Sequence, residues 1–140
     1  MDESNILRQE ELIREIEKKA KEIKPARIDE ILKEENKIKD KSKKLNLTKF
    51  SQFFKNLKLA MEMLKDYRSK SYTNIPWRSI ALLVAGILYF MNPFDIVPDF
   101  FPIIGFTDDA VMLAAILKSM QGDLKKYCDW KGYKAEEYFV

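Results

Sequence analysis

The chain has 140 residues, a length that allows one packed domain with an extension but not two separate cores. It contains only 4 Gly and 5 Pro among many Lys, Glu, Ile and Leu residues, so the composition predicts an all-α fold. Histidine is absent from the sequence and Cys128 is its single cysteine. These two facts exclude zinc fingers, Ser-His-Asp triads, Cys-His dyads and an internal disulfide.

Charge is distributed unevenly along the chain, although the net charge is only +3. Residues 1–36 contain 8 basic and 11 acidic side chains, residues 37–70 contain 11 and 3, and residues 71–140 contain 6 and 8. The middle third is therefore strongly basic. The first residues are acidic and polar, unlike a secretory signal, so we expect a cytoplasmic location.

An amphipathic helix is predicted near the N-terminus, because apolar residues recur there at helical spacing: Ile6, Ile13, Ile16, Ala20 and Ile23. Pro25 should end this helix and start the next one. Residues 37–44 have few apolar side chains and predict a frayed helix end or a linker. We therefore expect residues 1–45 to form a charged extension, either an arm or a helical pair. Its apolar seam needs a covering surface, which predicts self-association or a protein partner.

A second amphipathic helix is predicted over residues 48–67, with Thr48 as its N-cap. Its apolar face is rich in aromatic side chains: Phe50, Phe53, Phe54, Leu57, Met61, Leu64 and Tyr67. The favoured interpretation is that this face forms core. Its lysines leave two alternatives open, an anionic membrane surface and a nucleic acid. Nucleic acid is the least favoured, because the aromatic residues are not interleaved with the basic ones.

An almost entirely apolar helix is predicted over residues 76–91, and a second apolar run follows over residues 110–117, with Gly122 as its stop. The first would be about 24 Å long, short of the roughly 30 Å hydrocarbon core of a bilayer. Between the two lie Pro93, Pro98 and Pro102, which a continuous helix cannot accommodate. The sequence thus predicts an apolar helical hairpin within a bundle of five or six helices.

The segment joining the two apolar helices carries a specific pattern of prolines and acids. It consists of Pro93, Asp95, Pro98, Asp99, Pro102, Gly105, Asp108 and Asp109. This pattern resembles the signature of the YkvA-like domain of unknown function, and the resemblance extends over residues 77–117. It implies a small bacterial helical module, often membrane-associated and in some eukaryotic members joined to membrane-bound ubiquitin ligases, and it implies no catalytic residue. We accordingly assign residues 46–140 to a YkvA-like domain, with its motif at 92–109.

The four aspartates of this motif have three interpretations. The favoured one is structural: Asp95, Asp108 and Asp109 lie where helix starts are expected, and carboxylates there interact favourably with free backbone amides and the positive helix end. The second is a site for Mg²⁺, Mn²⁺ or Ca²⁺ formed by Asp95, Asp99, Asp108 and Asp109, since these ions prefer oxygen ligands. The third, a catalytic pair of carboxylates, is the weakest, because no substrate-binding signature accompanies it. Arg78 is a further candidate partner for one of these acids.

The sequence is compatible with two forms of membrane association, an integral hairpin and a peripheral contact at the membrane surface. Basic residues flank the hairpin and acids lie at its tip, which suits an integral hairpin at the inner membrane. Asp108 and Asp109 oppose insertion, because each central carboxylate costs about 2.5–3.5 kcal/mol. We therefore predict a non-enzymatic helical interaction module, soluble or peripheral at the membrane. A metal-dependent enzyme using the aspartates and an integral membrane hairpin are the alternatives.

Overall fold

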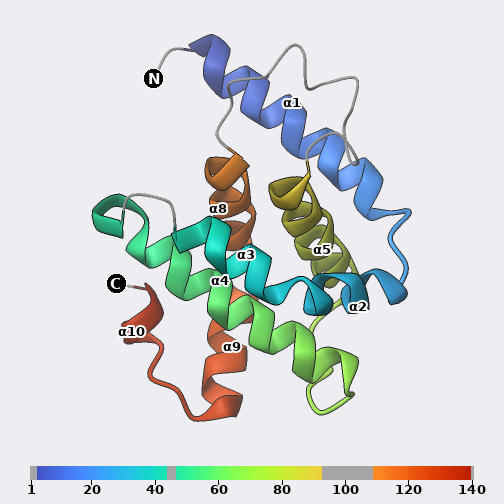
Figure 1. Ribbon diagram of the computed structural model, residues 1–140, viewed down its shortest axis with the longest axis vertical. Coiled ribbons are helices and arrows are strands. Elements are labelled where there is room, and N and C mark those ends of the chain that lie inside the picture. The colour runs from blue at the N-terminus through green and yellow to red at the C-terminus, as the bar shows by residue number, and fades with distance from the viewer. Residues whose placement is uncertain (1–2, 44–46, 93–108, 140) are drawn as a thin grey trace.

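The computed structural model describes residues 3–43, 47–92 and 109–139. These residues form eight helices and no strands (Figure 1). The helices are α1 (Glu3–Ala20), α2 (Ala26–Lys33), α3 (Glu35–Lys43), α4 (Leu47–Arg68), α5 (Trp77–Met91), α8 (Asp109–Ser119), α9 (Gln121–Lys131) and α10 (Glu136–Phe139). The predicted all-α fold is confirmed. The expected five or six helices were too few, because short breaks divide the chain more often than its apolar periodicity indicates.

The apolar helix α5 lies at the centre of the bundle. Ten of its 15 residues are buried. The helix begins at Trp77, one residue after the predicted start, and Pro76 is its N-cap in an extended conformation. Helices α1, α2 and α8 pack against α5, and rings of α4 contact both of its ends, through the pairs Phe53–Phe90 and Tyr67–Trp77. A helix that is apolar on every face is stable in water only when it is covered in this way.

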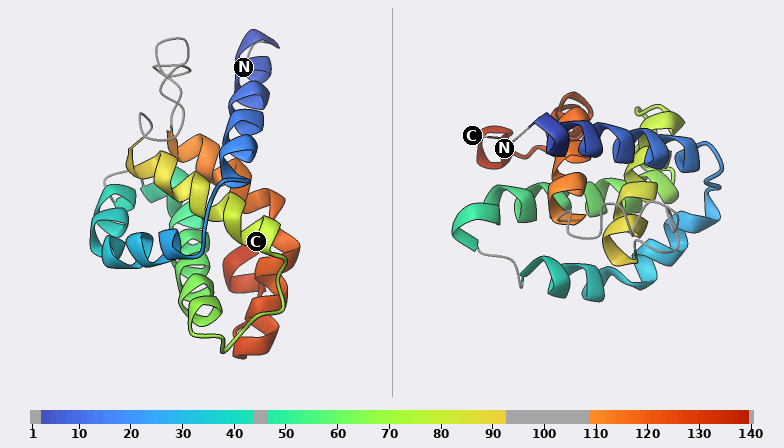
Figure 2. Two further views of the ribbon diagram at one scale, coloured as in Figure 1. Left: turned by 90° about the vertical axis from the view of Figure 1, so that its right-hand side faces the viewer. Right: turned by 90° about the horizontal axis from the view of Figure 1, so that it is seen from above.

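Helix α5 and helix α8 form the predicted apolar hairpin. The C-terminal end of α5 and the N-terminal end of α8 lie beside one another (Figures 1 and 2). The helices meet closely at Gly86, where an added Cβ atom would lie 2.7 Å from Cδ1 of Ile116 and 3.3 Å from Cδ1 of Leu113. The glycine therefore lets the two helices approach closely. The Pro/Asp-rich turn predicted between them lies outside the described residues.

The N-terminal helices belong to the same core as the hairpin. In α1, Leu12, Ile16 and Ala20 are buried, and α1 packs along α5. The apolar stripe of α1 is thus covered by α5 of the same chain at these residues. A second copy of the chain is not needed to cover them. The first turns of α1 extend past the ends of α5 and α8 (Figure 2). Self-association through this helix and the division of the chain at residue 45 stay predictions.

Residues 37–43, for which the sequence predicted a frayed helix end or a linker, are helical and packed. Residues 35–43 form helix α3, which packs against α4. Ile38 and Ser42 are buried, and the Ser42 hydroxyl donates to the Lys39 carbonyl at 2.7 Å. One buried isoleucine and a tertiary contact are enough to hold this helix, because helices in proteins are stabilised mainly by packing.

Helix α4 is the longest of the described helices and carries the aromatic face that the sequence predicted. Phe53, Leu57, Met61 and Leu64 are buried. Helices α2 and α3 lie on one side of α4, and α9 and α10 lie on the other (Figure 2). The helix begins at Leu47, so Thr48 is its second residue and not the N-cap that was expected.

The C-terminal region packs back on α4, and its helices end at different residues from those expected. Gly122 is not a helix stop, because α9 begins at Gln121 and includes it. The stop is Gly132, which has a φ of 82°. Glycine adopts this left-handed conformation without the steric cost that other residues incur. Tyr133 then donates its backbone N–H to the carbonyl of Cys128 at 2.9 Å and completes the helix end.

The close contact at Gly86 predicts how the hairpin responds to larger side chains. Gly86→Leu should lower the free energy of unfolding by about 1–3 kcal/mol, because a long side chain does not fit between α5 and α8. Gly86→Ala should cost less, since the terminal methyl of Ile116 can rotate away and alanine favours the helix by about 1 kcal/mol. Gly122→Leu is the matched control, because a Cβ atom there has no neighbour within 4 Å. Urea unfolding measures all three, and an unaffected Gly86→Leu protein would contradict the close approach.

Candidate functional site at the hairpin and the α4–α9 seam

Most of the predicted motif lies outside the described residues. This applies to Asp95, Asp99 and Asp108 among the acids and to Pro93, Pro98, Pro102 and Gly105. Asp109 is the first residue of α8, a position where a carboxylate favours the helix start. Within residues 3–43, 47–92 and 109–139, no group of three or more Cys, Asp or Glu side chains could hold a metal ion. The metal site proposed for the four aspartates stays a prediction.

The described residues show what holds the ends of the motif. Helix α5 ends at Met91, and Asn92 donates its N–H to the Leu88 carbonyl at 2.8 Å. Helix α8 begins at Asp109 and buries Ala110 immediately afterwards. The residues that enter and leave the motif are therefore fixed by two packed helices lying side by side.

Lys41 of α3 stabilises the end of α5 that leads into the motif. Its ammonium group donates a hydrogen bond to the backbone carbonyl of Phe90 and lies 4.7 Å from the centroid of the Phe90 ring. Helix α5 has no basic residue in its last turn. A cation from another helix thus complements the negative end of α5, and the aromatic ring adds a cation–π contact.

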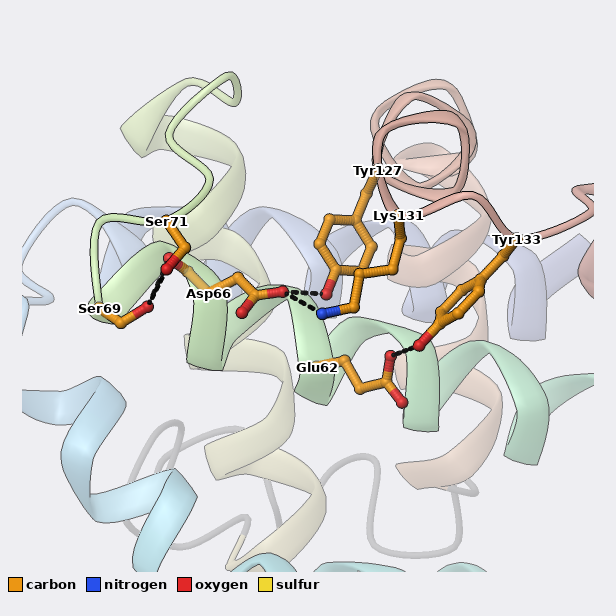
Figure 3. A network of polar contacts seen from close by, with 7 residues as sticks. All are labelled: Glu62, Asp66, Ser69, Ser71, Tyr127, Lys131 and Tyr133. Carbon is orange, nitrogen blue, oxygen red and sulfur yellow. Dashed lines mark hydrogen bonds and ion pairs between the residues drawn. The ribbon is translucent and has the colours of Figure 1, made fainter.

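A seam of polar contacts joins α4 to α9 and to the residues that follow it (Figure 3). The carboxylate of Asp66 accepts a hydrogen bond from the Tyr127 hydroxyl and another, at 3.0 Å, from the Lys131 ammonium. Glu62, one helical turn before Asp66, accepts from the Tyr133 hydroxyl at 2.9 Å. The spacing of four residues places the two acids on one face of α4 and the donors Tyr127 and Lys131 on one face of α9.

The pKa values of the groups in this seam are shifted in the directions expected for side chains that join two helices. Burial would raise the pKa of Asp66, but the hydrogen bonds from Tyr127 and Lys131 outweigh it and lower the pKa. Burial and the neighbouring Asp66 raise the pKa of Tyr127, which therefore keeps its proton and donates it. Burial also raises the pKa of the Cys128 thiol, which makes it a poor nucleophile. These groups can join helices, but they form no pair of nucleophile and general base.

Sequence reasoning did not identify the seam or the Lys41 contact. The spacing of Glu62 and Asp66 was a local signal, because two acids four residues apart must share a face of a helix. Their partners lie 61 and 71 residues away in the chain. No periodicity within one helix identifies such a partner.

Over the described residues, the geometry is that of an all-helical protein in which a buried pair of apolar helices is surrounded by charged helices. A family model described as a protein of unknown function (DUF1232) matches residues 79–115, which cover most of that hairpin. The chain is 33% identical over 94 residues to a Bacillus subtilis (strain 168) protein described as the uncharacterized membrane protein YkvA. That alignment covers 67% of this chain and 82% of the relative. The chain therefore belongs to the YkvA-like DUF1232 family. No solved structure matches it.

The contact of Lys41 with Phe90 generates a stability prediction. Lys41→Met keeps the aliphatic part of the side chain but loses the hydrogen bond and the charge at the end of α5. The free energy of unfolding should fall by about 1–2 kcal/mol. Lys43→Met, an exposed position of the same helix, should change it by less than about 0.5 kcal/mol. Equal effects of the two substitutions in urea unfolding would show that Lys41 does not support α5.

The lowered pKa of Asp66 generates a prediction about pH. Because the folded-state pKa lies below the ordinary value of 3.8, the carboxylate stabilises the fold above about pH 4 and loses this effect as the pH falls further. In Asp66→Asn, the free energy of unfolding should be lower near neutral pH and should fall less steeply under acid conditions. Asp129→Asn, an exposed acid of α9, should keep the wild-type slope. Identical slopes in wild type and Asp66→Asn, measured by urea unfolding at each pH, would disprove the role of Asp66.

Proposed function

We propose that the protein is a non-enzymatic helical module that attaches to the surface of a membrane without inserting its hairpin. The observation that carries this proposal is the burial of α5, whose ten buried residues all lie between Ile80 and Phe90. Insertion would require these side chains to exchange the helices that cover them for lipid. The covering helices α1 and α2 are amphipathic and highly charged, so they could not accompany α5 into the hydrocarbon region at low cost.

The lengths of the helices also favour attachment at the surface. At about 1.5 Å per residue, the 15 residues of α5 extend roughly 22 Å, less than the hydrocarbon thickness of about 30 Å. Among the helices of the described residues, none combines the length and the apolar character needed to cross a bilayer. A Bacillus relative described as a membrane protein supports membrane association of some kind. A surface contact is the form of association that leaves the core intact.

Exposed basic side chains supply an attraction to an anionic surface. Lys21 is exposed just after α1, Arg78 is exposed in the first turn of α5, and Lys118 is exposed in the last turn of α8. Each basic residue close to an anionic leaflet contributes about 1 kcal/mol, and salt screens this contribution. Attachment of this kind should be reversible, in contrast to an inserted helix. We place it at the cytoplasmic face of the inner membrane, where a protein partner could also bind.

Fractionation of cells that express the full chain tests the proposal. The protein should sediment with membranes at low ionic strength, because electrostatic attraction is then least screened. Roughly 1 M salt, at which the Debye length is about 3 Å, should release it. Alkaline carbonate should release it as well. An endogenous protein with a transmembrane helix serves as the control that both washes leave in the pellet.

Two results would contradict the proposal in different ways. Retention in the pellet after carbonate would mean that the hairpin is inserted. Absence from the membrane fraction at low ionic strength would mean that the protein does not bind membranes.

A further inference from the structure

A cavity of about 680 Å³ lies where the end of α1 and the start of α5 meet the junction of α8 and α9. Its volume falls in the range of sites that bind small molecules. The cavity is at the start of α5, and so at the opposite end of this helix from the residues that lead into the proline- and aspartate-rich motif. It is therefore separate from the motif ends described above.

The charged groups of the cavity are predominantly basic. Lys21 and Arg78 line it and are both exposed. Neither side chain takes part in an ion pair within the part of the chain that the structure describes. Glu17 contributes one carboxylate against these two cations. Helix α5 has no acid in its first turn and no side-chain cap. The positive end of its dipole therefore adds to the positive potential of Lys21 and Arg78.

Apolar side chains lie next to these cations in the same cavity. Trp77 and Leu82 are half-buried and pack against the core, and Met120 is buried. The ring of Trp77 stacks on Tyr67 with centroids 6.3 Å apart, which holds it in place beside Arg78. A ligand in this cavity would therefore meet both cations and an apolar wall.

Two other cavities lack this combination. The cavity between α4 and α10, of about 450 Å³, places Lys55 and Lys58 among three glutamates. In the cavity between α2 and α5, also about 450 Å³, Arg27 pairs with Glu30, and Lys37 pairs with Glu34 at 3.2 Å. In the first of these cavities the acids outnumber the lysines, and in the second two of the three basic residues, Arg27 and Lys37, are paired with acids. Neither cavity is lined by a tryptophan, whereas Trp77 lies beside Arg78.

We infer that the cavity lined by Lys21, Trp77 and Arg78 receives the phosphate headgroup and upper acyl chain of an anionic phospholipid. A guanidinium group can bind two phosphate oxygens at once, and an ammonium group adds a point charge. Tryptophan is favoured at the depth where headgroups meet acyl chains, because its ring is apolar and its N–H is polar. The inference rests on the proposed attachment to membranes and identifies the surface and the lipid class responsible.

Binding to vesicles tests the role of the two cations. The probes are vesicles of phosphatidylcholine alone and of phosphatidylcholine mixed with phosphatidylglycerol. The wild-type protein should bind the mixed vesicles. Lys21→Gln combined with Arg78→Gln should weaken that binding about 30-fold, the equivalent of about 1 kcal/mol for each lost cation. Lys126→Gln combined with Lys134→Gln removes the same charge from exposed positions outside the cavity and should weaken binding less than about 3-fold. Thermal unfolding checks that both variants remain folded.

Fluorescence tests whether lipid enters the cavity. In Trp130→Phe, the only remaining tryptophan is Trp77. Phosphatidylglycerol brominated on its acyl chains should quench this fluorescence, because bromine would lie next to the ring. Inorganic phosphate alone should neither change the fluorescence nor displace the protein from vesicles, since it lacks the acyl chain.

The outcomes separate this inference from the proposed function. Equal weakening by the two pairs of substitutions, or an unquenched Trp77, would overturn the lipid site while membrane attachment stands. Displacement by inorganic phosphate would overturn it in favour of a site for free anions. A wild-type protein that binds neither anionic vesicles nor native membranes would overturn the proposed function as well.

Discussion

The helix α5 has to be covered on every side, and this constraint explains the arrangement of the other helices. Its sequence, WRSIALLVAGILYFM, offers no polar face that could remain in water. Helix α8 covers it where Gly86 allows close approach, and α1 and α2 cover other faces with their own apolar stripes. The two ends of α5 receive different partners: Lys41 and Phe53 contact Phe90, and Tyr67 contacts Trp77. The apolar residues of the N-terminal third are thus part of the core, and its charges remain on the surface.

The uneven charge of the sequence is partly balanced between helices. In the basic middle third, Lys65 pairs with Glu35 at 2.7 Å, and Arg68 binds Asp29 through two nitrogens at 2.9 and 3.0 Å. Both acids belong to the acidic first third of the chain. Exposed pairs of this kind contribute at most about 1 kcal/mol each, so they orient α2 and α3 on α4 more than they hold them there. The basic residues that remain unpaired are those available to an external anion.

Sequence reasoning succeeded where the signal was local and failed where it depended on distant residues. Apolar periodicity and prolines located α1, α4, α5 and α8, because helical spacing and the backbone limits of Pro25 and Pro76 act within a few residues. Helix α3 was expected to be no more than a frayed helix end or a linker, since its stability comes from packing on α4. The contact of Asp66 with Tyr127 was missed for the same reason. Of the acids in the motif, Asp109 is among the described residues and begins α8, the kind of position that the structural interpretation gave it.

A relative described as a membrane protein and a hairpin too short to cross a bilayer are compatible once α5 is understood as core. The same apolar residues cannot both fill the interior of the bundle and face lipid, and the charged helices around α5 make the first use the less costly one. Under the proposed function, membrane affinity comes from the surface, where cations outside ion pairs lie beside half-buried apolar side chains, a combination that suits an anionic bilayer. At the start of α5 such groups surround a cavity, whereas the other end of the hairpin carries the family motif. The proposed lipid site and the residues that lead into the family motif thus lie at opposite ends of α5.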